Sequence, residues 1–342
     1  MIKVAINGFG RIGRLAFRQM ITSTDYDIVA INNKNLTADE AAYLIKYDTV
    51  HNTFHENEIT FDGNELVIAG VKRVKLFSEL DPTKLPWKEL EVDLVLECTG
   101  AFTNYEGAYK HILAGAKKVL ISAPGKDEMP TIVSGVNENI LKPTDIIVSA
   151  ASCTTNCLAP LLKIIEDNFG IEKGFMSTIH ALTADQNSLD NFHKKGINSR
   201  RGRASIQNIV PTSTGAAKAI GLVIPSLNGK MDGIAYRVPC IDGSMIDVTL
   251  ELKRNTSKEE INEVIKKNQS SALIYTEAPL VSSDVIGKKC GCLFDSLLTN
   301  VIEVDGKQLV KLTAWYDNEY GYTAQMLRTA VNMFKGVDKW NL

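Results

Sequence analysis

The stretch Ile2-Lys3-Val4-Ala5-Ile6-Asn7-Gly8-Phe9-Gly10-Arg11-Ile12-Gly13 decides the fold of the first half of the chain. A short apolar run is followed by the pattern G-x-G-x-x-G, after which apolar residues recur at steps of three and four. This order of strand, turn and helix is typical of a dinucleotide-binding domain. We expect Gly8 to permit the tight turn, Gly10 to let the backbone approach a pyrophosphate, and Gly13 to let the helix pack against the strand.

Short apolar runs alternate with helical patterns through the rest of the first half. This alternation favours right-handed β-α-β crossovers and a mostly parallel sheet, so the expected fold class is α/β with a Rossmann domain. The expected strands are Ile2–Ile6, Asp27–Ile31, Asp93–Cys98, Lys118–Ile121 and Asp145–Ser149, with a helix around Ala108–Leu113.

The second half has a different pattern. Its strand-like stretches alternate partly between apolar and polar residues and are not each followed by a helix, which predicts a second, α+β domain with a mixed or antiparallel sheet. We place the domains at 1–152 and 153–318, and expect the C-terminal helical segment, 319–342, to complete the first domain. The expected strands are Phe175–His180, Gly233–Val238, Met245–Leu252 and Leu309–Trp315.

Composition narrows the class of protein. The 342 residues carry a net charge of −2, which excludes the broadly basic character of a non-specific nucleic-acid binder. We expect no membrane span and no signal peptide, because the chain has no uncharged apolar stretch of about 18 residues and no leader pattern. The six cysteines form no C-x-x-C pair, so we expect reduced thiols in the cytoplasm and no metal site.

The second expected strand ends at Asn32-Asn33-Lys34, where a dinucleotide-binding domain usually carries an acidic residue for the adenosine ribose. An asparagine can accept a hydrogen bond from a ribose hydroxyl but does not repel a 2′-phosphate, and Lys34 can attract one. Asn33 and Lys34 therefore weaken a strict preference for NAD over NADP.

Cys153 and His180 are the expected nucleophile and base. Cys153 lies in Ser152-Cys153-Thr154-Thr155-Asn156-Cys157, where an apolar strand gives way to an amphipathic helix. A helix N-terminus stabilises a thiolate, so we expect a lowered thiol pKa. His180 follows the strand Phe175–Ile179 and can pair with that thiolate. Cys157, one turn further on, reads better as a buried core residue.

Two further features concern the remaining histidines and the basic residues. His51, His55 and His111 lie in polar or helical surroundings and are expected on the surface. A basic loop containing Arg201 precedes Pro211-Thr212-Ser213-Thr214-Gly215. In a slightly acidic chain, such a cluster beside hydroxyl groups suits phosphate binding.

Together these residues resemble the phosphorylating glyceraldehyde-3-phosphate dehydrogenase family over essentially the whole chain. The motif at 152–157 is the most specific part of the resemblance. The resemblance implies a cytoplasmic homotetramer that oxidises glyceraldehyde 3-phosphate with NAD and inorganic phosphate in glycolysis. The other segments that carry it are Ile6–Arg14, Gly215–Ala219, Arg237–Pro239 and Trp315–Glu319.

The resemblance also assigns residues. It implies Cys153 as nucleophile, His180 as base, and Thr183 and Arg237 as the groups that hold the substrate phosphate. It assigns the attacking phosphate to Ser152, Thr154, Arg201, Thr214 and Gly215. It assigns cofactor contacts to Arg11, Ile12, Thr99, Ser122 and Asn318, with Asn318 facing the nicotinamide amide. These join the cofactor residues that the glycine turn and the strand end already predict, which are Gly8, Gly10, Gly13, Asn33 and Lys34.

Three positions depart from the family pattern. Asn33 stands where NAD-preferring members carry Asp, Leu80 where an Arg is common, and Phe192 where a Pro is common. Asn33 and Phe192 weaken the discrimination against NADP. Leu80, in contrast, removes a cation that could hold a 2′-phosphate. NAD is the expected cofactor, with dual use of NADP left open.

Two alternatives stay open at this point. One is an erythrose-4-phosphate dehydrogenase, in which hydrolysis replaces attack by phosphate. The other is a binding protein that uses the dinucleotide fold as a scaffold for RNA or for a surface receptor. The basic loop and Thr214-Gly215 favour phosphate as the acceptor, and a complete nucleophile and base favour an enzyme.

Overall fold

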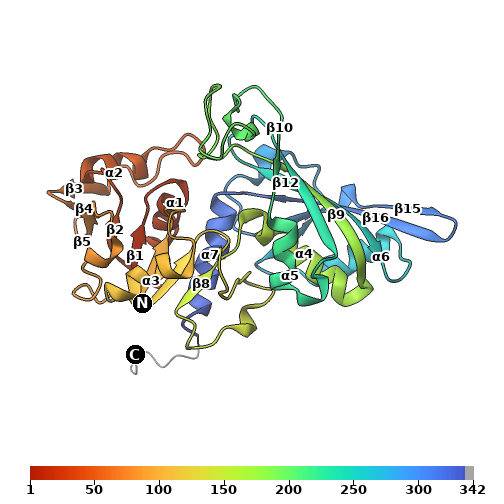
Figure 1. The fold of residues 1–342 in the computed structure, drawn as a ribbon, viewed down its shortest axis with the longest axis horizontal. Helices are drawn as coiled ribbons and strands as arrows, with labels where there is room; N and C mark the ends of the chain where they lie inside the picture. Colours follow the sequence, from red (N-terminus) through yellow and green to blue (C-terminus); the bar gives the residue numbers. More distant parts are fainter. Residues whose placement is uncertain (336–342) are drawn as a thin grey trace. The chain divides into compact units, whose positions relative to one another are not determined.

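The computed structural model describes residues 1–335 and divides into two units, each of which is described by itself (Figure 1). The first unit contains Met1–Ile132, Glu138–Ala151 and the segment from Met326 onward. The second contains Val133–Asn137 and Ser152–Gln325. None of the helices in the described part of the chain combines the length and the apolar character that crossing a bilayer requires.

The first unit is built on an eight-stranded sheet in the order β3-β4-β5-β2-β1-β6-β7-β8. The strands from β5 to β8 are parallel, whereas β3, β4 and β5 form an antiparallel meander. The strands are β1 (Ile2–Asn7), β2 (Tyr26–Asn32), β3 (Ile59–Asp62), β4 (Glu65–Ile68), β5 (Lys72–Phe77), β6 (Leu94–Glu97), β7 (Lys118–Ile121) and β8 (Ile147–Ser149).

Helices bury both faces of this sheet. On β1, Val4 and Ile6 pack in one apolar cluster and Ala5 packs in another on the opposite face. Burial on both faces explains why these strands read as continuous apolar runs. The first cluster includes residues of α1 (Arg11–Met20), α2 (Ala38–Lys46) and α7 (Tyr320–Asn332), and the second includes a residue of α3 (Tyr105–Leu113).

The later part of α7 is fastened to the first unit by buried side chains. The Tyr26 hydroxyl donates to the carbonyl of Leu327 at 2.5 Å, and Lys118 Nζ donates to the carbonyl of Met333 at 2.8 Å. The C-terminal segment thus joins this unit from Met326, compared with the expected 319, and residues 336–342 of the expected 319–342 lie outside the described residues.

The second unit contains a mixed sheet in the order β10-β11-β9-β12-β16-β14-β13, with β15 paired to β16. The β9–β12–β16–β14 pairs are antiparallel, and the β11–β9 and β13–β14 pairs are parallel. The strands are β9 (Ile171–His180), β10 (Val210–Ser213), β11 (Met231–Arg237), β12 (Ser244–Leu252), β13 (Leu273–Thr276), β14 (Cys292–Asp295), β15 (Asn300–Val304) and β16 (Lys307–Tyr316).

One face of this second sheet is covered by helices. Along β12, Ile246, Val248 and Leu250 are buried and the residues between them are half-exposed, which is the alternation of a sheet with one covered face. The long helix α4 (Cys153–Phe169) contacts β9, β12, β14 and β16, and its neighbours are α5 (Ala216–Val223) and α6 (Lys258–Lys267).

The observed architecture confirms the expected fold class of a Rossmann-type domain with a second, mixed-sheet domain. The division between the units falls between Ala151 and Ser152. The meander of β3 to β5 and the helices α2, α5 and α6 had no sequence prediction. A signal was present for α6, where Ser257 caps the helix and the buried Ile261 and Ile265 are four residues apart.

Candidate active site

The three glycines of the first turn have different surroundings, as their positions in the motif predict. Gly8 has a φ of +95°, and a Cβ there would lie 2.6 Å from the amide nitrogen of Thr99. A Cβ at Gly13 would lie 2.1 Å from the carbonyl oxygen of Gly8. A Cβ at Gly10 would meet no atom within 4 Å. The turn is therefore tight at Gly8, close-packed at Gly13 and open at Gly10, which fits a dinucleotide pyrophosphate.

The open side of this turn belongs to a pocket of about 390 Å³ at the carboxyl ends of the strands. The pocket brings together five of the predicted cofactor residues: Gly8, Gly10, Asn33, Lys34 and Thr99. Its other lining residues are Asn7, Asn32, Glu79, Leu80, Cys98, Ala101 and Phe102.

Arg11, Ile12, Gly13 and Ser122 do not line this pocket. Arg11 and Ile12 begin helix α1, whose first turn has neither a capping side chain nor an acidic residue, so the backbone N–H groups there suit an anion. The Arg11 guanidinium forms an ion pair with Asp48. Ser122 follows β7, and its amide donates to the carbonyl of Glu97 at 3.0 Å.

Asn33 supports the turn as well as the pocket. Its Oδ1 accepts a hydrogen bond from the Phe9 amide at 2.9 Å, and its Nδ2 donates to the carbonyl of Lys34 at 3.1 Å. The side chain thus ties the end of β2 to the glycine turn and lies where the adenosine ribose is expected.

In the second unit, Cys153 is the first residue of α4, and Ser152 caps this helix by accepting from the Thr155 amide at 3.1 Å. The Cys153 Sγ lies 3.4 Å from Nε2 of His180, which ends β9. His180 Nδ1 lies 2.8 Å from the carbonyl oxygen of Ala181. In the tautomer that carries its hydrogen on Nδ1, this nitrogen donates to the Ala181 oxygen and Nε2 presents its lone pair to the thiol, as a base requires. The Arg237 guanidinium nitrogen 3.0 Å from Nδ1 then donates to Thr183 and to the Ala181 carbonyl and not to Nδ1.

Tyr316 links the helix that carries Cys153 to the strand that carries His180, although sequence reasoning gave Tyr316 no role. Its hydroxyl lies 2.9 Å from the Thr154 hydroxyl and 2.8 Å from the Thr178 hydroxyl. Thr154 neighbours Cys153 and Thr178 precedes His180 by two residues, while the Tyr316 ring lies edge-on to the imidazole. Tyr316 therefore fixes the distance between nucleophile and base.

The pKa of the Cys153 thiol differs from the value that the sequence predicts. Burial raises the pKa of the Cys153 thiol, although Arg237 and the Thr154 hydroxyl oppose the rise. Burial, reinforced by Arg237, lowers the pKa of His180 to about 3. The helix N-terminus thus does not lower the thiol pKa as expected, because desolvation outweighs it. A proton can pass directly from Sγ to Nε2, which creates two opposite charges together.

Arg237 and Thr183 lie side by side next to the base. One guanidinium nitrogen of Arg237 lies 3.1 Å from the Thr183 hydroxyl, 3.0 Å from His180 Nδ1 and 3.3 Å from the carbonyl of Ala181. Arg237 is 9% exposed, so its charge is held in a largely dry site where it attracts an anion strongly. This is the expected place for the substrate phosphate.

Asp185, which sequence reasoning missed, links the two expected anion sites. Its carboxylate accepts from the Thr183 hydroxyl at 2.5 Å and forms an ion pair with Arg201. Thr214 and Gly215 lie at the start of α5, where Thr214 Oγ1 accepts from the Ala216 amide at 3.2 Å. Within residues 1–335, no hydrogen bond joins Thr214 or Gly215 to Arg201, so this expected phosphate site is not assembled by direct contacts.

Asn318 is held by Ser244, a second residue without a sequence prediction. The carboxamide Oδ1 accepts from the Ser244 hydroxyl at 2.6 Å, and that hydroxyl accepts from the Ala181 amide at 3.0 Å. One buried serine thereby connects Ala181, the residue directly after the base, to Asn318, the predicted nicotinamide contact.

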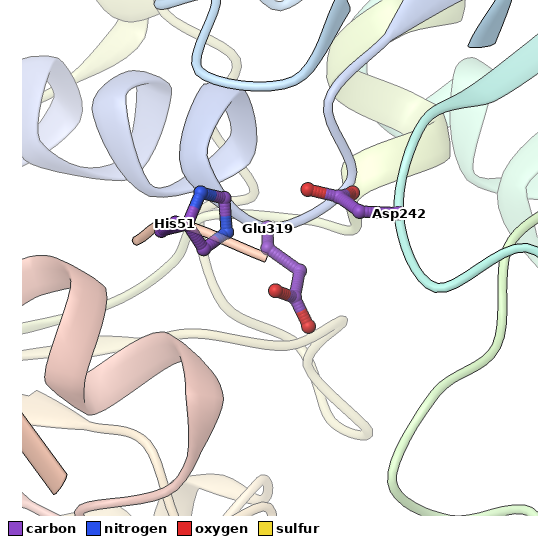
Figure 2. A group of neighbouring side chains, drawn as sticks. All are labelled: His51, Asp242 and Glu319. Atoms are coloured by element: carbon purple, nitrogen blue, oxygen red, sulfur yellow. The ribbon is translucent and has the colours of Figure 1, made fainter. Parts of the chain in front are cut away.

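Acidic side chains lie beside Asn318. Burial, with repulsion from Asp317 and Glu319, raises the pKa of Asp242 to about 9. Asp317 itself accepts from the amides of Glu319, Tyr320 and Gly287. Figure 2 draws Asp242 and Glu319; His51, also labelled there, belongs to the first unit.

The comparisons with known proteins agree with this geometry. Residues 2–105 match the NAD-binding domain of glyceraldehyde 3-phosphate dehydrogenase, and residues 152–318 match its C-terminal domain. The chain is 53% identical over 329 residues to the glyceraldehyde-3-phosphate dehydrogenase of Clostridium pasteurianum, covering 96% of this chain and 97% of that protein. The enzymes of the same name from Clostridium acetobutylicum and Mycoplasma pneumoniae are 52% and 53% identical, over 97% and 96% of their lengths and 96% of this chain.

A dinucleotide-binding domain joined to a domain with a paired thiol and imidazole defines an NAD-linked oxidoreductase. The two matched domains, together with the 53% identity over 96% of the chain, then narrow this class to one family. The chain belongs to the glyceraldehyde-3-phosphate dehydrogenase family.

Proposed function

We propose that this chain oxidises glyceraldehyde 3-phosphate with NAD and inorganic phosphate, giving 1,3-bisphosphoglycerate and NADH. The observation that carries the proposal is the 3.4 Å contact between Cys153 Sγ and His180 Nε2, with Arg237 beside it. A nucleophile, a base and an anion-binding cation then lie within one buried cluster. The bound cofactor supplies the two-electron acceptor.

The chain's own residues divide the reaction into two steps. Cys153 Sγ attacks the aldehyde carbon as its proton passes to His180 Nε2, and His180 returns this proton to the former carbonyl oxygen, which gives a thiohemiacetal. His180 Nε2 then takes the hydroxyl proton as the former aldehyde carbon gives up a hydride to the nicotinamide cofactor, which leaves a thioester. Attack by phosphate breaks the C–S bond, and the departing thiolate takes up the proton that His180 holds, while the proton of the attacking phosphate passes to solvent. The covalent thioester replaces one difficult step by two easier ones.

Two anion sites serve the two phosphates. Arg237 and Thr183 hold the phosphate of the substrate, and Arg201 with Ser152, Thr154, Thr214 and Gly215 receives the attacking phosphate. Asp185 neutralises Arg201 and orients Thr183. A phosphate arriving at Arg201 has to compete with this carboxylate, so we expect Asp185 to rotate away when phosphate binds.

The assembly and cell compartment belong to the same proposal. Exposed apolar side chains are concentrated between residues 189 and 209, where Phe192 is 74% and Ile197 88% exposed. A surface of this kind supports a homotetramer, which light scattering tests. No disulfide joins any of the six cysteines, all of which lie among the described residues, and this supports a reducing compartment such as the cytoplasm.

The test of substrate and acceptor uses the purified chain with NAD or NADP. Glyceraldehyde 3-phosphate should be oxidised faster than erythrose 4-phosphate, and turnover should require phosphate. Faster oxidation of erythrose 4-phosphate without phosphate would instead identify the hydrolytic enzyme. Binding of RNA without any aldehyde-dependent NAD reduction would favour a binding protein.

A further inference from the structure

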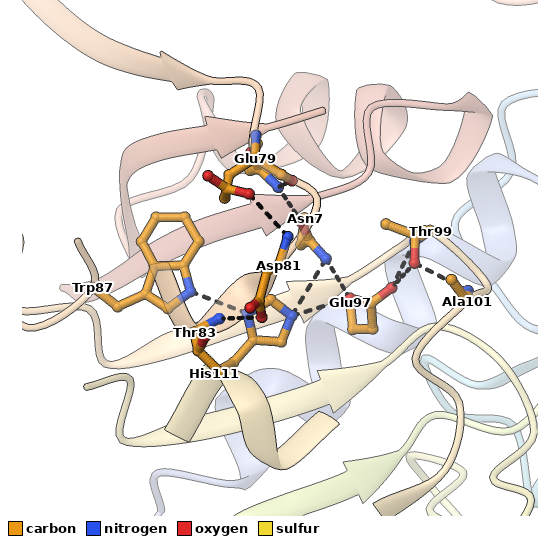
Figure 3. A network of polar contacts seen from close by, with 10 residues as sticks. Asn7, Glu79, Asp81, Thr83, Trp87, Glu97, Thr99, Ala101 and His111 are labelled. Carbon is orange, nitrogen blue, oxygen red and sulfur yellow. Dashed lines mark hydrogen bonds and ion pairs between the residues drawn. The ribbon is translucent and has the colours of Figure 1, made fainter. Parts of the chain in front are cut away.

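A buried side chain, Glu97 at the end of β6, contacts Asn7 and Thr99, two of the residues that line the 390 Å³ pocket (Figure 3). Glu97 is 1% exposed, and its two oxygens receive hydrogen bonds from three residues. Oε2 accepts from Asn7 Nδ2 at 2.5 Å and lies 3.1 Å from His111 Nε2. Oε1 accepts from the Thr99 amide at 2.8 Å and from the Thr99 hydroxyl. Both oxygens of this side chain are thus fully occupied by hydrogen-bond partners.

Trp87 determines the tautomer of His111. The indole Nε1 lies 3.0 Å from His111 Nδ1, and an indole N–H can only donate. Nδ1 must therefore be the acceptor, and the ring hydrogen is on Nε2, where it donates to Glu97. His111 is fully buried, contrary to the expected surface position, because this side chain faces the sheet and not solvent.

The network continues to the other strand ends that line the pocket. Asn32 Nδ2 donates to Asn7 Oδ1 at 2.7 Å, and Asn32 Oδ1 accepts from the Glu79 amide at 2.8 Å. The ends of β1, β2 and β6 and the segment after β5 are thus joined by side chains. Burying a carboxylate and an imidazole is unfavourable unless both are fully paired, so the network holds one specific arrangement.

We propose that Glu97 is a positioning residue for NAD, with His111 and Trp87 orienting it. Glu97 holds Asn7, the residue before Gly8, and Thr99, and both line the pocket. The Thr99 hydroxyl is already used, since it donates to Glu97 and accepts from the Ala101 amide at 3.0 Å. Thr99 therefore contributes shape to the pocket, and Glu97 fixes that shape. This inference rests on the proposed function only in taking the ligand of the pocket to be NAD.

Glu97→Gln tests the proposal directly. A carboxamide has one acceptor oxygen, so its NH₂ group faces two donors in either orientation. We expect the dissociation constant for NAD, measured by calorimetric titration of the apo protein, to rise about tenfold or more, because buried hydrogen bonds are lost. The kcat at saturating NAD should change by less than about threefold, because Cys153 and His180 belong to the other unit.

Tyr26→Phe is the matched control. It removes a buried 2.5 Å hydrogen bond from the same unit, at the start of β2, whereas the pocket lies at the end of this strand. It should lower the melting temperature of the apo protein without changing the affinity for NAD. A loss of affinity equal to that of Glu97→Gln would mean that general destabilisation explains both.

His111 provides a pair of variants that decides the matter if Glu97→Gln does not fold. Gln can place a donor near the position of Nε2, and Leu cannot, so His111→Gln should bind NAD more tightly than His111→Leu. Wild-type affinity in both, or in a folded Glu97→Gln, would overturn the proposal. A wild-type chain that fails to bind NAD would instead contradict the proposed function.

Discussion

The hydroxyl of Ser244 donates a 2.6 Å hydrogen bond to Oδ1 of Asn318. Because this oxygen is occupied, the Nδ2 group of Asn318 is the part left to contact the carboxamide of a nicotinamide. The same hydroxyl accepts from the Ala181 amide, next to His180. One buried side chain therefore sets the orientation of the expected cofactor contact relative to the base.

Ser244→Ala should disturb that orientation without removing a reacting group. We expect a loss of about tenfold in kcat/KM for NAD, the size of one lost hydrogen bond of about 1.4 kcal/mol. The rate of Cys153 alkylation in the absence of cofactor should stay within about twofold. Slower alkylation of equal size would show that Ser244 acts on the nucleophile and not on Asn318.

His180→Asn should slow oxidation by about 10²–10⁴-fold, the usual contribution of a positioned acid–base group. Removing the proton acceptor 3.4 Å from Sγ also leaves the thiol without a partner for its proton. Alkylation of Cys153 by iodoacetamide should therefore become slower near pH 7 and set in at higher pH. Cys153→Ser, as the control, should abolish labelling at this position. An unchanged pH profile in His180→Asn would count against the pairing.

Asn33→Asp should increase discrimination against NADP. Asp keeps an oxygen for the Phe9 amide, and its second oxygen adds a negative charge to a pocket that Lys34 also lines. A 2′-phosphate then meets a like charge, whereas ribose hydroxyls gain a charged acceptor. We expect the ratio of NAD to NADP efficiency to rise about tenfold, equivalent to roughly 1.4 kcal/mol. Steady-state kinetics with both cofactors measures it, and an unchanged ratio would show that residue 33 does not face the ribose.

Asp242→Asn should flatten the pH dependence of stability. In the folded protein the pKa of Asp242 is raised from 3.8 to about 9, so the folded state keeps a proton that the unfolded state releases. The free energy of unfolding therefore falls as pH rises between these two values, by at most about 1.4 kcal/mol per pH unit. Denaturant unfolding from pH 7 to 8.5 should show a steeper loss for wild type than for Asp242→Asn. Parallel curves would mean that Asp242 is ionised in the folded protein.

The sequence predicts best what depends on local pattern. The glycine turn, the parallel strands and the position of Cys153 at the start of α4 all follow from spacing within short segments. His111 shows where this fails, because a histidine in a polar helix looks exposed until Trp87 and Glu97 are brought against it. The pairing depends on strands and helices far apart in the chain.

The sequence did not predict the raised pKa of the Cys153 thiol, for a related reason. A helix N-terminus can be recognised from the sequence, but the burial that opposes it depends on which side chains close over Cys153. Tyr316 and Ser244 were missed because their roles lie entirely in long-range hydrogen bonds to Thr154, Thr178 and Asn318. The residues next to Tyr316 and Ser244 in the sequence form no pattern that predicts these hydrogen bonds.

The most direct test of the proposed mechanism is a stopped-flow measurement of NADH formation from glyceraldehyde 3-phosphate and NAD, first without phosphate and then after its addition. A thioester on Cys153 that waits for phosphate predicts a rapid burst of about one NADH per chain, followed by near arrest, and sustained turnover once phosphate is added. Steady NADH formation without phosphate, at a rate that phosphate does not change, would contradict it.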